Sequence, residues 1–396
     1  MTSDETLHLS ATRPVLVVTV VHHPEDARIR HREIAALLDA GIPVTYAASF
    51  SDHDVSPGTA PGLTTIDLPR AVGRRRLRAA RAARAVVRRL APQHGAVIVH
   101  DPELLVALAG LRLPHLIWDV HEDTAAAIEV KGWLPPALRR PAAAGVRLLE
   151  RAAERSRHLL LAEPGYADRF SRQHVVVPNT TTVPASVPLP QSNRIVYLGS
   201  VTVARGAQVM VELGRLLHER TDGALTVEII GPPRDEETRR ILDDAAARGH
   251  VRLHGFVPNA TALELVEGSL VGVSLLQDLP NYRHSTPTKI YEYLARGVPV
   301  VTTPLPVAEQ LVEASGAGFV VPFDDAAAAA EAVLRLHEDR DLARELGRRG
   351  HAYAQAHHDW STQSGAFVAA VRAVMDGRII RSPQTASLPP GESPHV

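Results

Sequence analysis

The chain has 396 residues, of which 45% are hydrophobic, and its 44 acidic side chains nearly balance its 43 basic ones. This length predicts two domains, the balanced charge gives no indication of a nucleic acid partner, and the lack of cysteine excludes disulfides and thiolate chemistry. The polar N-terminus has no apolar signal segment, and the apolar runs are too short to span a membrane, so we expect a cytoplasmic protein.

Apolar segments of strand length alternate with helical segments through the first half of the chain. Residues 14–21 (PVLVVTVV) predict a strand, and apolar side chains at helical spacing follow it as far as Gly41. Strands this apolar are buried on both faces, which predicts a parallel sheet covered by helices. Five more predicted strands lie in the segments 42–48 (IPVTYAA), 95–101 (GAVIVHD), 114–123 (PHLIWDVHED), 158–164 (HLLLAEP) and 174–179 (HVVVPN).

The same pattern begins again after a Pro- and Thr-rich linker at 178–193. We therefore predict an α/β protein with two doubly wound, parallel-sheet, Rossmann-like domains that face a cleft, at residues 1–185 and 194–355. Ligands of such sheets bind beyond the carboxyl ends of the strands. The six predicted strands of the second domain lie in 194–200 (RIVYLGS), 225–231 (LTVEIIG), 251–256 (VRLHGF), 270–276 (LVGVSLL), 298–303 (VPVVTT) and 318–322 (GFVVP).

One of the chain's two lysines, Lys289, lies near a predicted helix start, three residues before Glu292. The preceding Ser285 and Thr286 can cap the helix, whose free amides and nearby lysine suit a phosphate group. A carboxylate one turn later could accept hydrogen bonds from the hydroxyls of a ribose, so the segment indicates a nucleotide site. The alternative is an ordinary ion pair on the surface.

Glycine-containing loops follow other predicted strands of the second domain. Arg205, after the first of these loops, could hold a diphosphate with its planar guanidinium group. Loops of this kind are also ordinary turns in α/β folds, so each is a weak signal alone. The positions that we expect to contact the same nucleotide are Gly199, Ser200, Gly231, Phe256 and Val257.

Three predicted strands of the first domain end in histidine beside acidic residues. Because the carboxyl ends of parallel strands share one edge, these groups predict a functional site there. Three such histidines could also bind zinc, but their spacing matches no metal motif and we predict no metal. The groups are His22, His23, Asp26 and Arg28; His100, Asp101 and Glu103; and His121, Glu122 and Asp123.

Residues 70–92 form an arginine-rich segment without acidic residues. On a helix, the arginines between Arg70 and Arg89 cover one side and the apolar residues the other. Such a helix either has an ordinary solvated face or docks on anionic lipid.

The motifs YLGSVTVARG (197–206), LHGFVPN (253–259) and PTKIYEYLARGVPVV (287–301) resemble those of bacterial retaining nucleotide-sugar glycosyltransferases of family four (group 1), which have the GT-B fold. The likeness covers roughly residues 14–375. It implies that Glu292 binds the ribose, that Arg205 and Lys289 hold the donor diphosphate, and that His121 approaches the donor sugar. It also assigns an acceptor-side role to His22, His23, Asp26, Arg28, His100 and Asp101.

The chain departs from this family pattern at two positions. His284 stands where many relatives have a glutamate that touches the sugar, and Ser200 stands where an arginine follows the glycine. The identity of the donor sugar therefore stays open. The segment DWSTQSGAFVAAV (359–371) resembles the helix, about 356–376, that returns to the first domain, and we expect residues 378–396 to form a disordered tail.

The resemblance implies transfer of a hexose from a nucleoside-diphosphate sugar, with UDP more expected than GDP, to an acceptor hydroxyl with retention of configuration. It implies no other cofactor, and the acceptor would belong to a surface polysaccharide, a glycolipid or a natural product. Two alternatives remain at this point. A sugar-nucleotide epimerase of the same fold could use acids among Asp101, Glu103, Glu122 and Asp123, and a non-catalytic protein would only bind the nucleotide sugar.

Overall fold

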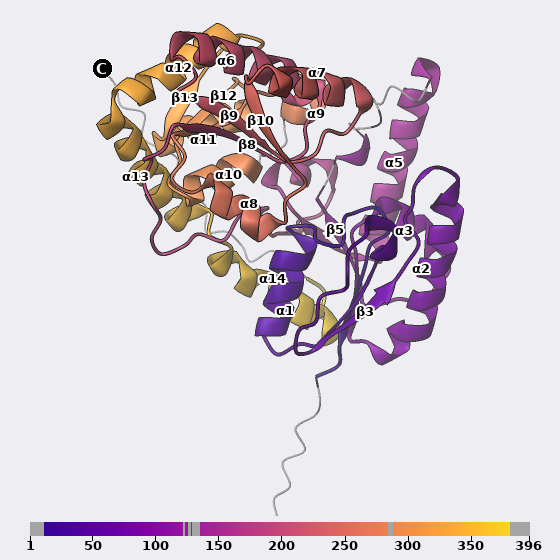
Figure 1. Cartoon of the computed structure of the whole chain (residues 1–396). Coiled ribbons are helices and arrows are strands. Elements are labelled where there is room, and N and C mark those ends of the chain that lie inside the picture. The colour runs from indigo at the N-terminus through magenta and orange to yellow at the C-terminus, as the bar shows by residue number, and fades with distance from the viewer. Residues whose placement is uncertain (1–11, 122, 126–127, 129–134, 284–287, 381–396) are drawn as a thin grey trace, which may run out of the picture. The chain divides into compact units, whose positions relative to one another are not determined.

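The computed structural model describes residues 12–121, 123–125, 128, 135–283 and 288–380. The chain divides into two compact units, one of residues 1–178 with 363–396 and one of residues 179–362. Each unit contains one all-parallel sheet with helices packed against it (Figure 1). This architecture is the predicted α/β fold with two Rossmann-like domains.

The first unit has a seven-stranded sheet of order β3-β2-β1-β4-β5-β6-β7. Its strands are β1 (Val15–Val18), β2 (Val44–Ala48), β3 (Leu63–Asp67), β4 (Ala96–Val99), β5 (Leu116–Val120), β6 (His158–Leu161) and β7 (Val175–Val176). Its helices are η1 (Ile29–Ile34), α1 (Ala35–Asp39), η2 (Ser51–His53), η3 (Gly73–Arg75), α2 (Arg76–Leu90), η4 (Ala91–Gln93), α3 (Pro102–Ala107), α5 (Pro136–Ser156), η5 (Pro164–Arg169) and α14 (Trp360–Met375).

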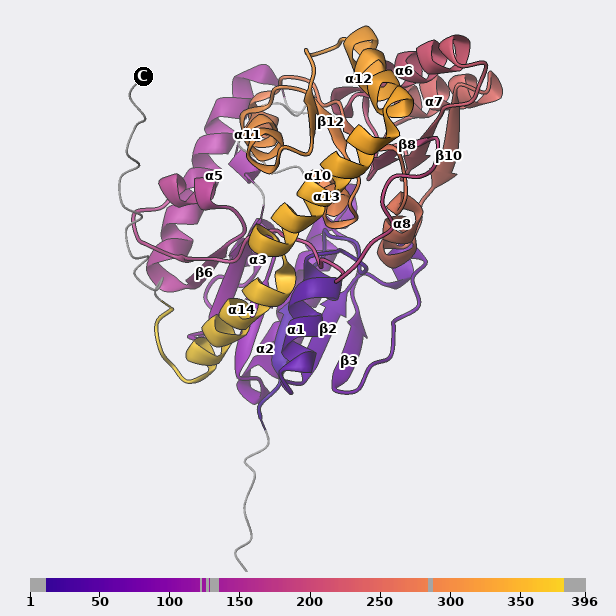
Figure 2. The same ribbon diagram turned by 90° about the vertical axis from the view of Figure 1, so that its left-hand side faces the viewer.

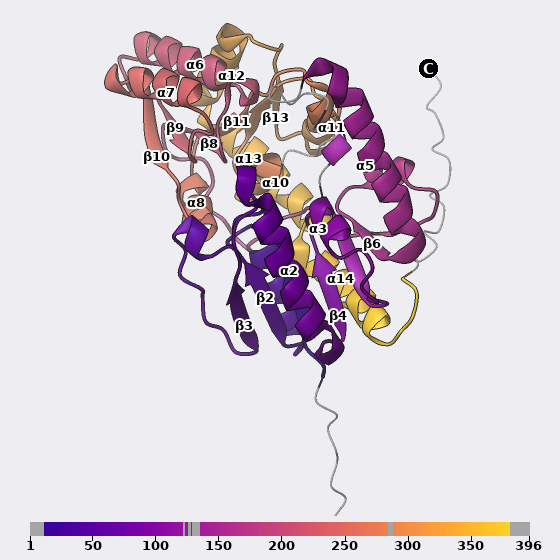
Figure 3. The same cartoon turned by 90° about the vertical axis from the view of Figure 1, so that its right-hand side faces the viewer.

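Helices cover both faces of this first sheet. Figure 2 shows α1 and α14 in front of the strands, and Figure 3, from the opposite side, shows α2 and α3 in front of them. The buried side of α2 consists of Ala79, Ala83 and Val87, which pack in one cluster with residues of β1, β4 and β5. Six of the seven strands lie in predicted segments. The seventh, β3, was missed because it is a partly exposed edge strand without an apolar run.

The second unit has a six-stranded sheet of order β10-β9-β8-β11-β12-β13, and all six strands lie in predicted segments. The strands are β8 (Arg194–Leu198), β9 (Thr226–Ile230), β10 (Val251–Gly255), β11 (Val271–Ser274), β12 (Val300–Thr302) and β13 (Gly318–Val320). The helices are η6 (Val203–Arg205), α6 (Ala207–Arg220), α7 (Glu236–Ala247), α8 (Asn259–Val266), α9 (Pro280–Arg283), α10 (Thr288–Ala295), α11 (Pro306–Ser315), α12 (Ala326–Glu338) and α13 (Arg340–His357).

Helix α10 packs closely against the middle of this second sheet because residue 272 of β11 is glycine. A Cβ atom at Gly272 would lie only 2.4 Å from the ring of Tyr293. The Tyr293 hydroxyl accepts a hydrogen bond from the amide of Leu198 (2.8 Å) and donates one to the carbonyl of Val273 (3.2 Å). The helical spacing of Tyr291, Leu294 and Val298 predicts that all three face the core. Leu294 and Val298 are fully buried, whereas the buried tyrosine of the helix is Tyr293 and not Tyr291. Its hydroxyl joins two strands, and this anchors α10 at their carboxyl ends.

Helix α14 belongs to the first unit from Gln363 onward. Its C-terminal part is tied there by hydrogen bonds from His115 Nδ1 to the carbonyl of Val374 (2.8 Å) and from Arg372 to the carbonyl of Ala40 (3.0 Å). The expected disordered tail lies outside the described residues from 381 onward. Among the helices that the structure describes, none combines the length and the apolar character that crossing a bilayer requires.

Candidate functional site

The loop after β8 brings three strand ends of the second unit into backbone contact. Gly199 has φ +111°, and a Cβ atom at Gly231 would lie 2.1 Å from the Gly199 carbonyl oxygen. At Gly206, with φ +88°, a Cβ atom would lie 2.2 Å from the carbonyl oxygen of Leu275. These glycines are required by close approach, and they leave an open loop of backbone between β8 and α6.

Arg205, at the end of this loop, is a cation without an acidic partner among the described residues. Thr202 caps the short helix by accepting a hydrogen bond from the Arg205 amide (3.2 Å). The guanidinium Nη1 donates to both the carbonyl and the hydroxyl oxygen of Ser200, each at 3.1 Å. Within the described part of the chain, Arg205 forms no ion pair. Its side chain is thus oriented while its charge stays available for an anion.

Lys289 of α10 is a second such cation in the same unit. Its Nζ lies 4.7 Å from the centre of the Tyr197 ring, and among the described residues it forms no ion pair. Burial, and then the charge of Arg205, lower the pKa of Lys289 to about 7, while Glu292 acts in the opposite direction. Two mutually repelling cations indicate a site that an anion would stabilise, since an anion would restore the lysine's proton.

Glu292 lies on α10 one turn after Lys289 and is only 7% exposed. This burial excludes the solvent-exposed ion pair that was the alternative interpretation of the motif. A carboxylate kept from solvent one turn after a buried lysine is suited to accept hydrogen bonds from a bound polar ligand.

The positions of the other predicted nucleotide contacts in the second unit say little about whether they bind a ligand. Phe256 follows β10 and its side chain is 58% exposed, whereas Val257 packs partly against the hydrophobic cluster of α10 and α11. The predicted capping residues, Ser285 and Thr286, lie outside the described residues.

The histidine-bearing strand ends of the first unit meet around a residue that sequence reasoning missed, Asp119 of β5. This buried carboxylate accepts hydrogen bonds from Arg28 Nε (2.8 Å) and Nη2 (2.7 Å), from His100 Nδ1 (3.2 Å) and from His121 Nδ1 (3.1 Å). Arg28 also donates to the Val177 carbonyl (3.0 Å) and is only 3% exposed. Its guanidinium group is therefore occupied within the unit. A charged residue inside an apolar strand was the available signal.

The charges within this cluster differ between the two histidines. Burial opposes ionisation of Asp119, but Arg28 outweighs it and holds the pKa of that carboxyl well below its usual range. Burial also disfavours the charged form of His121, but the hydrogen bond to Asp119 and the negative charge of Asp119 together outweigh it and raise the pKa of His121 to about 9. Burial lowers the pKa of His100. At neutral pH His121 is therefore the cationic member and His100 the neutral one.

A second line of contacts joins His121 to the end of β1. His121 Nε2 lies 3.1 Å from His22 Nε2, which lies 3.3 Å from Asp101 Oδ1. Asp101 is held by the Val20 amide (2.6 Å) and the Thr19 hydroxyl (3.1 Å). With both ring nitrogens protonated, His121 donates to Asp119 and to His22. The side chains of His22 and His121 are partly exposed, so this line reaches the surface of the unit.

Asp26 and His23 take different positions. Asp26 accepts from the amides of Arg28 (2.9 Å) and Ile29 (3.1 Å), and although burial opposes it, the charges of His22 and His121 lower its pKa. His23 instead accepts from the Glu25 amide (3.1 Å) through Nδ1 and lies apart, with its ring 4.6 Å from that of His53.

The acids proposed for an epimerase have other partners. Glu103 pairs with Arg76 (2.7 Å), Asp123 pairs with Arg147 (3.2 Å), and Asp101 holds the end of β1. Glu122 lies outside the described residues.

One group in this cluster has the spacing of a cation site. Ligand atoms of His100, Asp119 and His121 lie within 4.8 Å of one another. However, both histidines direct Nδ1 at Asp119, which already has the buried Arg28 as its counter-ion. We therefore interpret the group as a hydrogen-bonded network.

A segment of the second unit is similar to a known protein family. Residues 192–339 match the family model described as "Glycosyl transferases group 1". Over 200 residues the chain is 27% identical to the colanic acid biosynthesis glycosyltransferase WcaL of Escherichia coli (strain K12). That match spans 49% of this chain and 45% of the relative, so the chain spans less than half of the relative's length.

Solved structures resemble the chain over most of its length. Sucrose-phosphate synthase from Thermosynechococcus elongatus superposes with a TM-score of 0.72 at 17% identity, and the match covers 92% of this chain and 99% of the synthase. WaaG, a glycosyltransferase involved in lipopolysaccharide biosynthesis, gives 0.66 at 13% identity, with 89% and 98% covered. HepE of Anabaena, in complex with UDP and glucose, gives 0.63 at 14% identity, with 91% and 100% covered. The chain has the fold of these glycosyltransferases, and residues 192–339, which contain Arg205, Lys289 and Glu292, match the group 1 glycosyl transferase family.

Proposed function

We propose that this protein is a retaining glycosyltransferase that moves a hexose from a nucleoside-diphosphate sugar to an acceptor hydroxyl. The observation that carries the proposal is the pairing of Arg205 and Lys289, two cations without acidic partners in the described chain, with the buried Glu292. These residues lie in the segment that matches the group 1 glycosyl transferases. Their charges suit the diphosphate and ribose of such a donor.

In the proposed reaction the bond between the anomeric carbon and the diphosphate breaks, and negative charge develops on the departing phosphate. Arg205 and Lys289 stabilise this charge, which is where a fixed electrostatic site contributes most to the rate. Glu292 accepts hydrogen bonds from the ribose hydroxyls. The acceptor oxygen attacks from the same face, and its proton passes to the departing phosphate oxygen, which retains the anomeric configuration. Fixed positive charge takes the part that a metal ion would otherwise have.

The first unit supplies the acceptor side in this proposal. His121 is cationic at neutral pH, since Asp119 raises its pKa to about 9 against the effect of burial. Its Nε2–H, which points at His22 Nε2 in the structure, would be the donor to the hydroxyls of the donor sugar. His22 and Asp26 lie beside it, whereas Arg28 and His100 act through Asp119 and position it.

The relatives support a choice of donor and acceptor. The structure of HepE holds UDP and glucose, and WcaL and WaaG are named for colanic acid and lipopolysaccharide biosynthesis. We propose a UDP-hexose donor and an acceptor in a surface polysaccharide or glycolipid. A natural-product acceptor is the other outcome of an acceptor screen.

Thermal unfolding with a panel of nucleoside diphosphates tests the donor site. At about 100 times its dissociation constant a ligand adds about 2.7 kcal/mol of stability, so we expect one diphosphate, UDP, to raise the melting temperature. The Glu292→Ala variant should lose this shift, because the ribose hydroxyls lose their acceptor. Glu313→Ala, an exposed carboxylate of α11, should keep it. An equal shift in both variants would contradict the role of Glu292.

Helix α2 supports a further proposal, contact with an anionic bilayer at the cytoplasmic face. Three arginines of the predicted basic face are engaged elsewhere: Arg75 pairs with Asp52 and Arg76 with Glu103, each at 2.7 Å, and Arg84 donates to backbone carbonyls. Arg78 and Arg81 are exposed without an ion pair in the described chain, beside Leu77, which is 70% exposed. Exposed cations around an exposed leucine suit an anionic lipid surface.

Sedimentation with phosphatidylglycerol vesicles measures this contact. Each arginine near an anionic surface contributes about 1 kcal/mol, so Arg78→Gln/Arg81→Gln should weaken binding about 30-fold. The matched Arg239→Gln/Arg240→Gln variant of α7 should bind as the wild type does. If the wild type binds phosphatidylcholine equally well, or both variants behave alike, the basic face is only solvated.

A further inference from the structure

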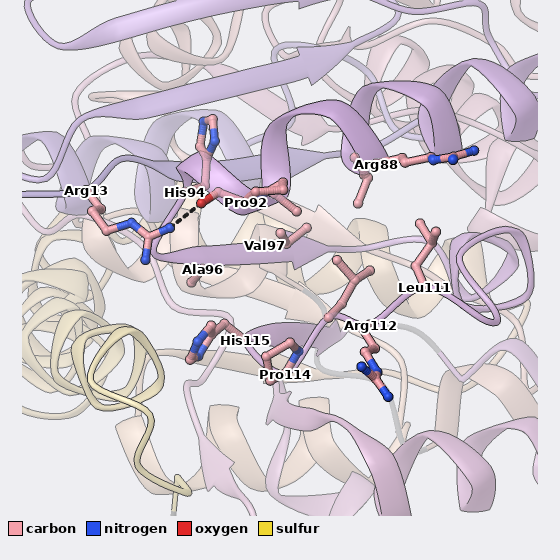
Figure 4. A pocket seen from close by; sticks show the side chains of 13 residues that line it. Arg13, Arg88, Pro92, His94, Ala96, Val97, Leu111, Arg112, Pro114 and His115 are labelled. Atoms are coloured by element: carbon pink, nitrogen blue, oxygen red, sulfur yellow. Dashed lines mark hydrogen bonds between the residues drawn. The ribbon is translucent and has the colours of Figure 1, made fainter.

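The first unit contains a cavity of about 450 Å³ that lies apart from the histidine cluster (Figure 4). It is lined by residues that precede or begin β1, β4 and β5, together with the last turn of α2 and the loop after α3. Ala96 and Val97 begin β4, and His100 follows its other end. The cavity and the cluster therefore lie at opposite edges of the same sheet, roughly 13 Å apart along a four-residue strand.

Among the described residues the lining carries positive charge and no acid. Arg13, Arg88 and Arg112 contribute to it, and none of its described residues is an aspartate or a glutamate. In the described residues none of these three arginines forms an ion pair, and only Arg13 has a hydrogen bond, to the Pro92 carbonyl (2.5 Å). Arg88 and Arg112 are exposed at the cavity, and their charges, which no acidic residue of the lining balances, favour an anion there.

The remainder of the lining is mostly apolar. In Figure 4 Val97 lies between Arg13 on one side and Arg88, Leu111 and Arg112 on the other. Leu113 is a further apolar residue of the lining. The lining contains no Trp, Tyr or Phe on which a nucleotide base could stack. This composition suits a hydrocarbon body better than a base.

The two histidines of the wall are held by the protein itself. His94 uses both ring nitrogens, one with the Leu90 carbonyl (2.7 Å) and one with the Thr45 hydroxyl (2.9 Å). His115 uses Nδ1 for the Val374 carbonyl at the end of α14. The wall is therefore fixed, and a volume of this size falls within the range of small-molecule sites.

We propose that this cavity binds an amphipathic phosphate, a molecule in which a phosphate group is attached to a hydrocarbon chain. Arg88 and Arg112, which lie on the same side of the cavity in Figure 4, hold the phosphate, to which guanidinium groups are matched in geometry and charge, and the apolar lining covers the chain. This site is independent of the proposed donor site, since no residue of the second unit contributes to it.

Calorimetric titration of the full chain with octyl phosphate tests the site. We expect saturable binding that Arg88→Glu/Arg112→Glu weakens about tenfold or more, equivalent to about 1.4 kcal/mol. The Ala91→Leu variant should also weaken binding, because it fills part of the cavity without changing its charge. The matched Arg151→Glu/Arg155→Glu variant reverses two exposed charges of α5, in the same unit but outside the cavity, and should bind as the wild type does.

Two simpler probes define what would overturn the proposal. If inorganic phosphate binds as tightly as octyl phosphate, the cavity is a site for simple anions. If octyl glucoside binds as tightly as octyl phosphate, the cavity recognises only the hydrocarbon chain. Equal weakening by both charge-reversed variants, or no saturable binding, also overturns it. Competition with phosphatidylglycerol vesicles then assigns the source. Displacement of octyl phosphate supports a bilayer lipid as the ligand, and its absence supports a soluble one.

Discussion

Replacing Arg205 by alanine is expected to lower kcat of sugar transfer about 100- to 1,000-fold, which is the usual effect of removing one fixed donor from a developing negative charge. Arg205 is already oriented by Ser200, so its stabilisation of the departing phosphate requires little rearrangement. The side chain is half-buried and has no acidic partner in the described chain, so folding should change little. Steady-state kinetics and thermal unfolding of the variant measure the two effects separately.

The control for Arg205 is Arg239→Ala on the exposed face of α7, which should retain wild-type kcat. Lys289 gives an independent check through pH. Burial and Arg205 lower its pKa to about 7, so its charge is present below that pH and lost above it. The kcat/KM value, which reports the free enzyme, should therefore fall above about pH 7, and Lys289→Arg should remove this fall. Unchanged kcat in Arg205→Ala would contradict the electrostatic role.

Replacing Asp119 by asparagine is expected to destabilise the first unit by about 3–5 kcal/mol, the effect of leaving one partner of a buried ion pair uncompensated. Asp119 and Arg28 are joined by two hydrogen bonds, and both side chains are almost fully buried. Although burial opposes it, Arg28 holds the pKa of Asp119 in the folded protein well below its usual range. The contribution of the pair to stability is therefore fully present above the pKa that Asp119 has in the unfolded chain. It is lost as the pH falls through the lower pKa of the folded protein. Chemical denaturation at neutral pH measures the loss.

Glu33 supplies the control for this prediction. Its Oε1 lies 3.0 Å from Arg28 Nε, but burial and the charge of Asp119 raise its pKa well above the usual range, which favours the neutral form. Glu33→Gln alone should thus cost little. In the Asp119→Asn background Glu33 can ionise and replace the lost charge, so the added Glu33→Gln change should cost distinctly more. Additive effects in this double-mutant cycle would contradict the assignment of Asp119 as the counter-ion.

The strands were predictable from the sequence where burial on both faces makes them continuous apolar runs. This holds for β1 and β8, and it fails for β3, whose edge position allows polar residues such as Thr64 and Asp67. The buried tyrosine of α10 was also predicted wrongly, although Leu294 was predicted correctly as a core residue. Whether Tyr291 or Tyr293 faces the core depends on the space above Gly272, which belongs to another element.

The candidate sites were predictable only in part for a similar reason. Residues such as His121 and Arg205 can be found from the sequence because they follow the apolar runs that predict strands. Asp119 does not, because it lies inside a strand and its importance comes from Arg28, 91 residues away in the sequence. The cavity at the opposite edge is assembled from residues as distant as Arg13 and Arg112, and no local pattern relates them.

Incubation of the wild-type protein with a panel of UDP- and GDP-sugars, followed by NMR, tests the central claim most directly. With an alkyl glycoside as acceptor, the proposed function predicts release of UDP from one donor and a new glycoside with the donor's anomeric configuration. Conversion of the sugar nucleotide to its epimer, without a glycoside, would contradict transfer and identify an epimerase. Binding of the donor without any turnover over the whole acceptor panel would contradict an enzymatic role altogether.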